Sequence, residues 1–368
     1  MKIKTLSVLA LTLCMSACQS KDELNMVVGT YTDGESKGMY SYTFNQETGK
    51  ATPLSEVDIS NPSYLTFSKN GDFIYSVSEN EGDEATANAF SFNKKSGEMK
   101  LINRQKTQGA HPCYIATDGK NVVAANYTGG SFTTFNIEKD GSLSPATSIN
   151  NFKDSHIGPD TIRQSSSHIH CTVFAPDGKH LFVTDLGGDR LYKYEIKDKK
   201  IATEKPSYTT IAAGSGPRHF TFAPNGKHAY LINELSGTVV CYLYHPDGLL
   251  EPLQTLQADT VGGRGSADIH ISPDGKYLYA SNRLQSDGIA IFKIDSASGK
   301  LTKAGYQLTG IYPRNFVITP NGKFLLVACR DSNVIQVYRR DPKTGLLADT
   351  KQDISLSEPV CIQLVARY

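Results

Sequence analysis

The amino-acid sequence predicts an all-β fold, a seven-bladed β-propeller with four antiparallel strands in each blade. Two alternating apolar runs joined by a Gly-containing turn recur along the 368 residues. The turn glycines are Gly71, Gly119, Gly178, Gly226, Gly275 and Gly322, at intervals of 48, 59, 48, 49 and 47 residues. A four-stranded unit of about 40–50 residues that repeats along a chain is typical of a propeller blade.

The first half of each unit reads as a tight hairpin. Asn-Gly or Asp-Gly stands between the two apolar runs, as in FTFAPNGKHAYLINE, IHISPDGKYLYASNR and FVITPNGKFLLVACR. This dipeptide between alternating runs is a strong signal for an antiparallel hairpin. A second set of polar Gly turns, such as HPDGLLEPL and SASGKLTKA, separates two further strands. Each unit therefore supplies strands A, B, C and D, with A innermost.

The seventh blade is split between the two ends of the chain. The segment MVVGTYTDGESKGMYSYTFNQETGK, starting at Met26, supplies strands B, C and D without an A strand. The final segment, EPVCIQLVARY, reads as an isolated A strand with Pro359 at its start, as other A strands have. Joining the two segments closes the ring and removes an exposed sheet edge. We therefore expect the propeller to cover residues 26–368.

The N-terminus has the pattern of an export signal. Lys2 and Lys4 precede the apolar run LSVLALTLCM, which is too short for a membrane span, and small residues lead to Cys18. MSAC followed by a polar tail resembles a bacterial lipoprotein box. We expect a signal peptide over residues 1–17, a lipid on Cys18 and a linker over 18–25. The mature protein would then be attached in the periplasm or at the outer membrane or cell surface, with simple secretion as the alternative.

Composition narrows the classes of partner. The formal net charge is +1, which favours neither nucleic acid nor an acidic membrane surface. The absence of Trp disfavours WD-repeat and quinoprotein propellers. We expect a monomer that acts on a small molecule without a cofactor. Five cysteines follow residue 18, namely Cys113, Cys171, Cys241, Cys329 and Cys361. Their number is odd and no two of them form a CxxC pair. We therefore expect no zinc site and no disulfide framework.

Hairpin geometry predicts which face of the propeller carries chemistry. In each A–B hairpin, the start of A lies beside the end of B, opposite the turn and near the mouth of the central channel. The turn ends repeat Asn/Asp-Gly-Lys, whereas the opposite ends carry titratable groups that differ among blades. The candidate site residues there are His111, His168, His170, Asp185, Arg218, His219, Glu234, Asp268, Arg283, Arg314 and Arg330. The interval of 59 residues marks an insertion in 150–167, and such insertions often lie on the working face.

The residue types alone leave several roles open. His168 and His170 are two residues apart on a predicted strand, so they would point the same way. They could form a metal pair, support a neighbouring loop, or serve anion binding and acid–base chemistry. Arg218 and Arg283 could pair with carboxylates as structural supports, or be oriented by them to bind an anion. The sequence by itself predicts a basic, His-containing pocket.

Three segments resemble a known family. They are SSSHIHCTVFAPDGKHLFVTDLGGDRL, GSGPRHFTFAPNGKHAYLINELSGTV and SADIHISPDGKYLYASNR. They are similar to the lactonase family of seven-bladed propellers, which includes a type of 6-phosphogluconolactonase and the fungal carboxymuconate-lactonizing enzyme. The resemblance extends from about Met26 to the end of the chain.

The resemblance implies an active site and a reaction. It implies a catalytic His at His168 or His170, with Arg218, Glu234 and Arg283 around the channel mouth. We expect substrate contacts from the remaining candidates, which are His111, Asp185, His219, Asp268, Arg314 and Arg330. The implied reaction is attack of water on a lactone carbonyl, with the His or Glu as general base and the arginines holding the anionic group and the oxyanion.

The chain departs from the family pattern at several positions. Ile169 replaces a usual Pro, Asp268 replaces Glu, and Cys329-Arg330 replaces Asn-Gln. The export signal also conflicts with a cytosolic substrate. We therefore keep a muconate-type lactonizing enzyme, a non-catalytic binding module and a calcium-dependent lactonase as alternatives. Substrate panels and a chelator would separate them.

Overall fold

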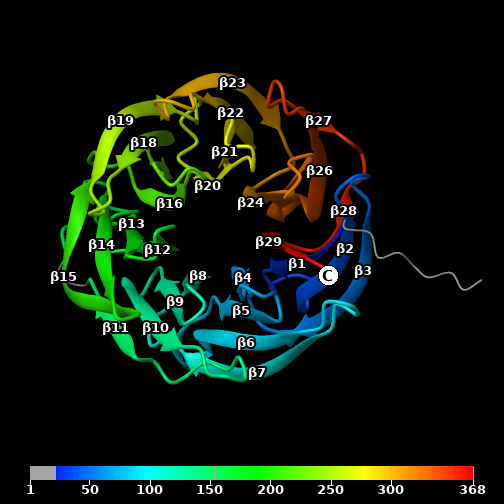
Figure 1. The fold of residues 1–368 in the computed structure, drawn as a ribbon, viewed down its shortest axis with the longest axis horizontal. Helices are drawn as coiled ribbons and strands as arrows, with labels where there is room; N and C mark the ends of the chain where they lie inside the picture. Colours follow the sequence, from blue (N-terminus) through cyan, green and yellow to red (C-terminus); the bar gives the residue numbers. More distant parts are fainter. Residues whose placement is uncertain (1–21, 153–154, 368) are drawn as a thin grey trace, which may run out of the picture.

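The protein is a closed ring of seven sheets around a central axis (Figure 1). The computed structural model describes residues 22–152 and 155–367. In each blade the strand nearest the axis contacts the innermost strands of both neighbouring blades. The predicted seven-bladed propeller with four antiparallel strands per blade is confirmed.

The blades are described from the innermost strand outward, in chain order. The closing blade contains β29 (Pro359–Ala366), β1 (Glu23–Thr30), β2 (Gly38–Asn45) and β3 (Ala51–Asp58). Blade 2 contains β4 (Leu65–Phe67), β5 (Phe73–Ser78), β6 (Thr86–Phe92) and β7 (Met99–Lys106). Blade 3 contains β8 (Pro112–Thr117), β9 (Asn121–Asn126), β10 (Ser131–Asn136) and β11 (Ser148–Asn151). Blade 4 contains β12 (Ile169–Phe174), β13 (His180–Asp185), β14 (Arg190–Lys197) and β15 (Lys200–Thr210).

The remaining three blades follow the same order. Blade 5 contains β16 (Pro217–Phe222), β17 (His228–Asn233), β18 (Thr238–Tyr244) and β19 (Leu250–Gln257). Blade 6 contains β20 (Ser266–Ile271), β21 (Tyr277–Asn282), β22 (Gly288–Ile294) and β23 (Leu301–Leu308). Blade 7 contains β24 (Pro313–Ile318), β25 (Phe324–Cys329), β26 (Val334–Arg340) and β27 (Leu347–Asp349), with β28 (Ile354–Ser355) also on β26. Two short 3-10 turns lie between consecutive strands. They are η1 (Gly82–Glu84), between β5 and β6, and η2 (Arg330–Ser332), between β25 and β26.

The two chain ends meet in the closing blade, as predicted. The C-terminal strand β29 pairs antiparallel with β1, placing Met26 opposite Leu364 and Val28 opposite Ile362. Strand β1 begins at Glu23, earlier than the expected propeller boundary at Met26. The predicted signal peptide and lipid site at Cys18 lie outside the described residues.

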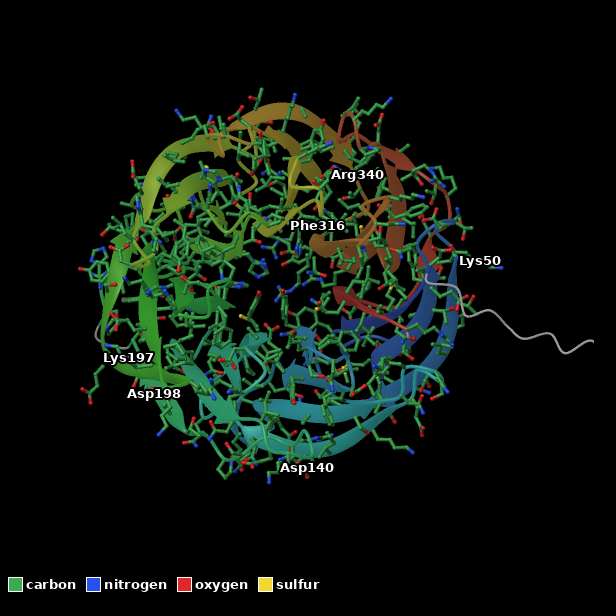
Figure 2. The ribbon with its side chains drawn as sticks, in the orientation of Figure 1. Lys50, Asp140, Lys197, Asp198, Phe316 and Arg340 are labelled. Atoms are coloured by element: carbon green, nitrogen blue, oxygen red, sulfur yellow. The ribbon has the colours of Figure 1, made fainter. Side chains whose placement is uncertain are left out.

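Burial follows the position of each strand in its blade. The second strands β9, β13, β17, β21 and β25 are buried along their whole length. Neighbouring blades cover both of their faces, which explains their nearly continuous apolar runs. Outermost strands such as β19 alternate between exposed and partly buried positions. Figure 2 places Phe316 toward the centre of the ring, and Asp140 and Lys197 at its outer edge.

The repeated A–B turns depend on glycine in the left-handed region. Gly226, between β16 and β17, has φ of +66°, and its amide donates to the Ala223 carbonyl at 2.9 Å. A Cβ there would meet only Pro176 Cγ within 4 Å, at 3.8 Å. Space is therefore available, and the backbone conformation alone selects glycine.

We expect Gly226→Ala to lower the free energy of unfolding by about 1–2 kcal/mol, the cost of placing Cβ in a left-handed conformation. Urea unfolding followed by circular dichroism measures this change. The exposed neighbour Lys227→Ala is the matched control and should change stability by less than about 0.5 kcal/mol. Equal stability of Gly226→Ala and the parent would show that the turn tolerates another backbone conformation.

Candidate active site

One backbone hydrogen bond recurs at the same rim of every blade. The residue that follows the second strand donates its amide to the carbonyl of a residue just before the innermost strand. N···O distances are 2.7–3.1 Å. The donor–acceptor pairs are Tyr31–Glu358, Glu79–Asn61, Tyr127–His111, Leu186–His168, Glu234–Gly216, Arg283–Gly265 and Arg330–Tyr312. This bond closes each hairpin opposite its turn and places seven residues of four types at equivalent positions on one rim of the ring.

A β-bulge supplies a second set of side chains at this mouth. The pairing register shifts around the second residue of β8, β12, β16 and β24. The residues at the bulges are Cys113, His170, Arg218 and Arg314. A bulge inserts an extra residue that re-aims its side chain, and bulges are frequent beside active sites.

Four residues of the first set and all four of the second line a cavity of about 240 Å³. Its wall consists of Glu79, Cys113, Tyr127, Arg163, His170, Arg218, Glu234, Arg283, Leu284, Tyr312 and Arg314. Four guanidinium groups face two carboxyl groups in this list. Titratable side chains therefore come together where innermost strands start and second strands end.

Glu234 is the carboxylate around which three arginines meet. Its Oε2 atom accepts from Arg218 Nε at 2.8 Å and lies 3.2 Å from Arg283 Nη2. Its Oε1 atom accepts from Arg163 Nη2 at 2.5 Å. Glu234, Arg218 and Arg283 are all buried. Charge-assisted bonds of this kind fix guanidinium groups in position.

The electrostatics of this cluster keep Glu234 ionised. Burial by itself would raise the carboxyl pKa, but Arg283, Arg218 and Arg163 outweigh it and lower the pKa to about 2. Burial and the neighbouring Arg283 lower the pKa of Arg218 to about 10, against the opposing effect of Glu234. Both groups are therefore charged at neutral pH.

Arg163 comes from the predicted insertion and was not among the candidate residues. Its guanidinium also donates to Tyr127 Oη at 3.2 Å. Asp160 holds the local turn by accepting from the Arg163 amide at 2.9 Å, and it pairs with Arg264. The buried Gln164 donates to the Leu186 carbonyl at 2.9 Å and ties the loop to the rim. The insertion therefore contributes Arg163 to the cavity wall, on the rim where we expected it to lie.

The two candidate histidines occupy different places. His170 sits at the bulge of β12 and lines the cavity, whereas His168 precedes the strand. The His168 ring stacks on Tyr127 at 4.4 Å between centroids, and the His170 ring meets Tyr127 edge-on at 5.4 Å. The expectation that both would point the same way from one strand needs correction, because the strand begins after His168 and bulges at His170.

Burial sets the protonation state of His170. Desolvation, followed by the nearby Arg218, lowers the imidazole pKa well below its usual value of 6.5. The imidazole is therefore neutral at pH 7. Its Nδ1 atom lies 3.8 Å from Cys113 Sγ, and burial holds that thiol in its protonated form by raising its pKa.

His219 and Asp268 lie behind Arg218 rather than on the cavity wall. His219 Nδ1 contacts Asp268 Oδ1 at 2.8 Å, and its Nε2 lies 3.3 Å from Arg218 Nη1. Burial and Arg218 lower the His219 pKa to about 4, so the neutral ring donates from Nδ1 and accepts from Arg218. Asp268 also accepts from Asn315 Nδ2 at 2.6 Å. We therefore assign both residues to supporting Arg218, in place of the expected contact with substrate.

The other predicted substrate-binding residues divide between cavity and support. Arg314 lines the cavity and lies 3.4 Å from Glu79 Oε2. Arg330 lies outside the cavity wall, with its guanidinium 3.7 Å from the centroid of the Tyr312 ring. His111 is bonded to Thr128 at 2.9 Å on the partly exposed rim. Buried Asp185 accepts from Ser167 at 2.7 Å and from the His168 and Gly188 amides, which fixes the loop.

Several cavity residues were missed by sequence reasoning. They are Cys113, Tyr127, Arg163, Leu284 and Tyr312. Tyr127 directly follows the second strand β9, as Glu79 follows β5, so a one-residue extension of the strand-end rule finds it. Cys113 occupies the position in β8 that Arg218 occupies in β16, but a single Cys in an apolar run gave no chemical signal.

Residues 22–152 and 155–367 contain no group of three or more His, Cys, Asp or Glu side chains arranged to hold a metal ion. No helix within the same ranges has the length and hydrophobicity needed to cross a bilayer. The five cysteines beyond residue 18 are free and buried.

Fold and site together define a class of protein, a seven-bladed propeller with a neutral histidine and an arginine-lined cavity at its channel mouth. Residues 25–364 match the family model described as lactonase, 7-bladed beta-propeller. The chain belongs to this lactonase family.

Relatives and solved structures agree with this assignment. A 6-phosphogluconolactonase from Formosa agariphila is 39% identical, covering 92% of this chain and 99% of the relative. One from Bacillus subtilis is 34% identical, with coverages of 92% and 97%. A Bacteroides fragilis structure is 55% identical with a TM-score of 0.90, covering 94% and 98% of the chains. The periplasmic gluconolactonase of Pseudomonas aeruginosa is 34% identical with a TM-score of 0.87, covering 94% and 100%.

We expect Glu234→Gln to destabilise the protein by about 3–5 kcal/mol at pH 7, because buried guanidinium groups lose their shared anion. The folded pKa of about 2 lies below the ordinary 4.5. The carboxylate therefore contributes stability above pH 4.5, and this contribution is lost as pH falls toward 2. Urea unfolding at pH 7 and pH 3 should show a smaller difference between the variant and the parent at pH 3.

The control for this measurement is Glu251→Gln, which removes an exposed carboxylate paired with His245. It should change stability by less than about 0.5 kcal/mol at pH 7. A Glu234→Gln protein as stable as the parent would contradict the assigned role of Glu234 as shared anion.

Proposed function

We propose that this protein hydrolyses the lactone of an anionic sugar acid, with 6-phosphogluconolactone as the first substrate to test. The observation that carries the proposal is the neutral imidazole of His170 in one cavity with four guanidinium groups. The names of relatives, 6-phosphogluconolactonase and periplasmic gluconolactonase, support the same substrate class.

The charge of the cavity favours an anionic substrate. Four arginines and two glutamates on its wall leave an excess of positive charge. Arg314 has one ion-pair contact among the described residues, at 3.4 Å from Glu79. It is therefore less committed to the protein than Arg218, which Glu234 and the Ala267 carbonyl hold at 2.8 and 2.6 Å. We assign the substrate's anionic group to the Arg314 side of the cavity.

His170 acts as the general base in this mechanism. A neutral imidazole can take a proton from water as that water attacks the lactone carbonyl. Glu234 is a poor choice for this step, since its pKa of about 2 makes it a weak base and its oxygens are engaged by arginines. Glu234 instead positions Arg218 and Arg283, which stabilise the oxyanion as fixed donors.

The functional test is a substrate panel on the mature protein. It should contain 6-phosphogluconolactone, gluconolactone and a muconate-type dicarboxylate, each assayed with and without a chelator. Chelator-insensitive lactone hydrolysis supports the proposal. Turnover of the muconate alone would assign the lactonizing reaction instead, and chelator-sensitive hydrolysis would assign a calcium-dependent lactonase. Binding without turnover would assign a binding module.

We expect His170→Ala to lower kcat/KM for lactone hydrolysis by about 10²–10⁴-fold, the usual contribution of a general base. Because the His170 pKa lies well below 6.5, parent activity should persist to pH values below 6.5 and fall only when this imidazole becomes protonated. Initial rates from pH 4 to 8 measure both effects. His245→Ala, which alters a half-exposed histidine away from the cavity, should retain parent activity and the parent pH profile.

We also propose export with a lipid on Cys18, supported by the N-terminal sequence pattern and by the periplasmic relative. Cys18→Ser should leave the protein unlabelled by a fatty-acid probe in bacteria and move it from the membrane fraction to the soluble fraction. Buried Cys361→Ser is the control and should keep both the label and the location. A labelled Cys18→Ser protein would contradict the lipid assignment.

A further inference from the structure

We propose that Tyr312 is the general acid of this site, delivering its phenolic proton to the ring oxygen of the lactone as the carbon–oxygen bond breaks. This inference rests on the proposed lactone hydrolysis and adds a catalytic residue to it. Tyr312 lies on the wall of the same cavity as His170, Arg283 and Arg314.

The backbone at Tyr312 belongs to a repeated feature of the blades. In five blades a proline begins or precedes the innermost strand, and the residue before it has positive φ. The values are +44°, +51°, +65°, +62° and +48° at Asn61, His111, Gly216, Tyr312 and Glu358. This conformation is uncommon for a bulky residue. The shared backbone therefore fixes the direction of the side chain, and blade 7 alone among these five places a phenol there.

Arginines hold the phenol on its face and at its oxygen. The guanidinium of Arg330 lies 3.7 Å from the ring centroid, and that of Arg283 lies 4.8 Å away. Arg283 Nη1 also donates to Tyr312 Oη at 3.1 Å. Among the described residues, no hydrogen bond runs from this hydroxyl to an acceptor. The proton of Tyr312 is therefore uncommitted in a site where a substrate oxygen would be its acceptor.

The neighbouring cations also favour loss of this proton. Burial would raise the phenol pKa, but Arg283, Arg314 and Arg330 outweigh it and lower the pKa below its usual value of about 10. Tyr31, whose ring centroid lies 5.3 Å from the Arg314 guanidinium, differs from Tyr312 in its hydroxyl partner and in the direction of its pKa shift. Its hydroxyl is committed to Glu79 Oε2 at 2.9 Å, and burial raises its pKa.

The reaction needs an acid because the leaving group is a sugar alkoxide. Water attacks the carbonyl carbon, and His170 takes one of its protons. The tetrahedral intermediate then collapses, the bond from the carbonyl carbon to the ring oxygen breaks, and the Tyr312 proton moves to that oxygen. The products are a hydroxy acid, the His170 imidazolium and the Tyr312 phenolate. A proton passes from imidazolium to phenolate through water, and the new carboxylic acid ionises.

Tyr312→Phe keeps the ring on which the arginines stack and removes the acid, together with the oxygen that accepts from Arg283. The test compares 6-phosphogluconolactone with its analogue in which sulfur replaces the ring oxygen, since a thiolate leaves without protonation. We expect kcat of the variant to fall by about 10²–10⁴-fold on the oxygen lactone. On the thiolactone we expect a change of less than about tenfold. An unchanged unfolding midpoint confirms that the fold is intact.

A pH profile gives an independent measure. The acid works only when protonated, so parent kcat, corrected for uncatalysed hydrolysis, should fall as pH rises through the lowered pKa of Tyr312. The variant should lack this alkaline limb. Tyr127→Phe is the matched control, because it removes a hydroxyl from the same cavity that accepts from Arg163. It should affect the two substrates equally and keep the alkaline limb.

Equal losses on both substrates together with a retained alkaline limb would overturn the proposal, and so would parent-like activity of Tyr312→Phe on the oxygen lactone. Both outcomes leave lactone hydrolysis itself in place. A parent protein that hydrolyses neither lactone would instead refute the proposed function, so the two failures can be told apart.

Discussion

The structure of the site depends on the backbone hydrogen bond that closes each A–B hairpin opposite its turn. Because the bond joins the end of the second strand to the start of the innermost strand, it repeats at one channel mouth in all seven blades. The bond uses only main-chain atoms, so the side chains at these positions are free to differ. The same scaffold therefore presents Glu79, Tyr127, Glu234 and Arg283 at equivalent places.

The cluster around Glu234 shows how one buried charge organises several others. Burying a carboxylate is costly unless it is paired, and three guanidinium groups meet that requirement. The arginines are held in turn by the carboxylate and by main-chain carbonyls. This arrangement leaves a rigid, positively charged wall against which charge can develop without rearrangement. The His219–Asp268 pair extends the support one layer further behind Arg218.

The fold could be predicted almost completely because its signals are local and repeated. Asn-Gly and Asp-Gly turns, their spacing and the split end segments all act through neighbouring residues and recur in register. The same periodicity led to five predicted residues that the structure brings to one cavity, namely His170, Arg218, Glu234, Arg283 and Arg314. Two residues lie off this pattern, because His168 precedes its strand and Tyr127 follows the end of β9.

The sequence by itself determined the blade count, the ring closure and the rim on which polar chemistry gathers, since each follows from strand period and turn chemistry. Only the tertiary structure decided which rim residues share a cavity. Bulges on the innermost strands re-aim individual side chains, and the insertion brings Arg163 to Glu234 across 71 residues of sequence. The ionisation of Glu234 and the neutrality of His170 were also decided there, because both depend on burial and on charges from other blades.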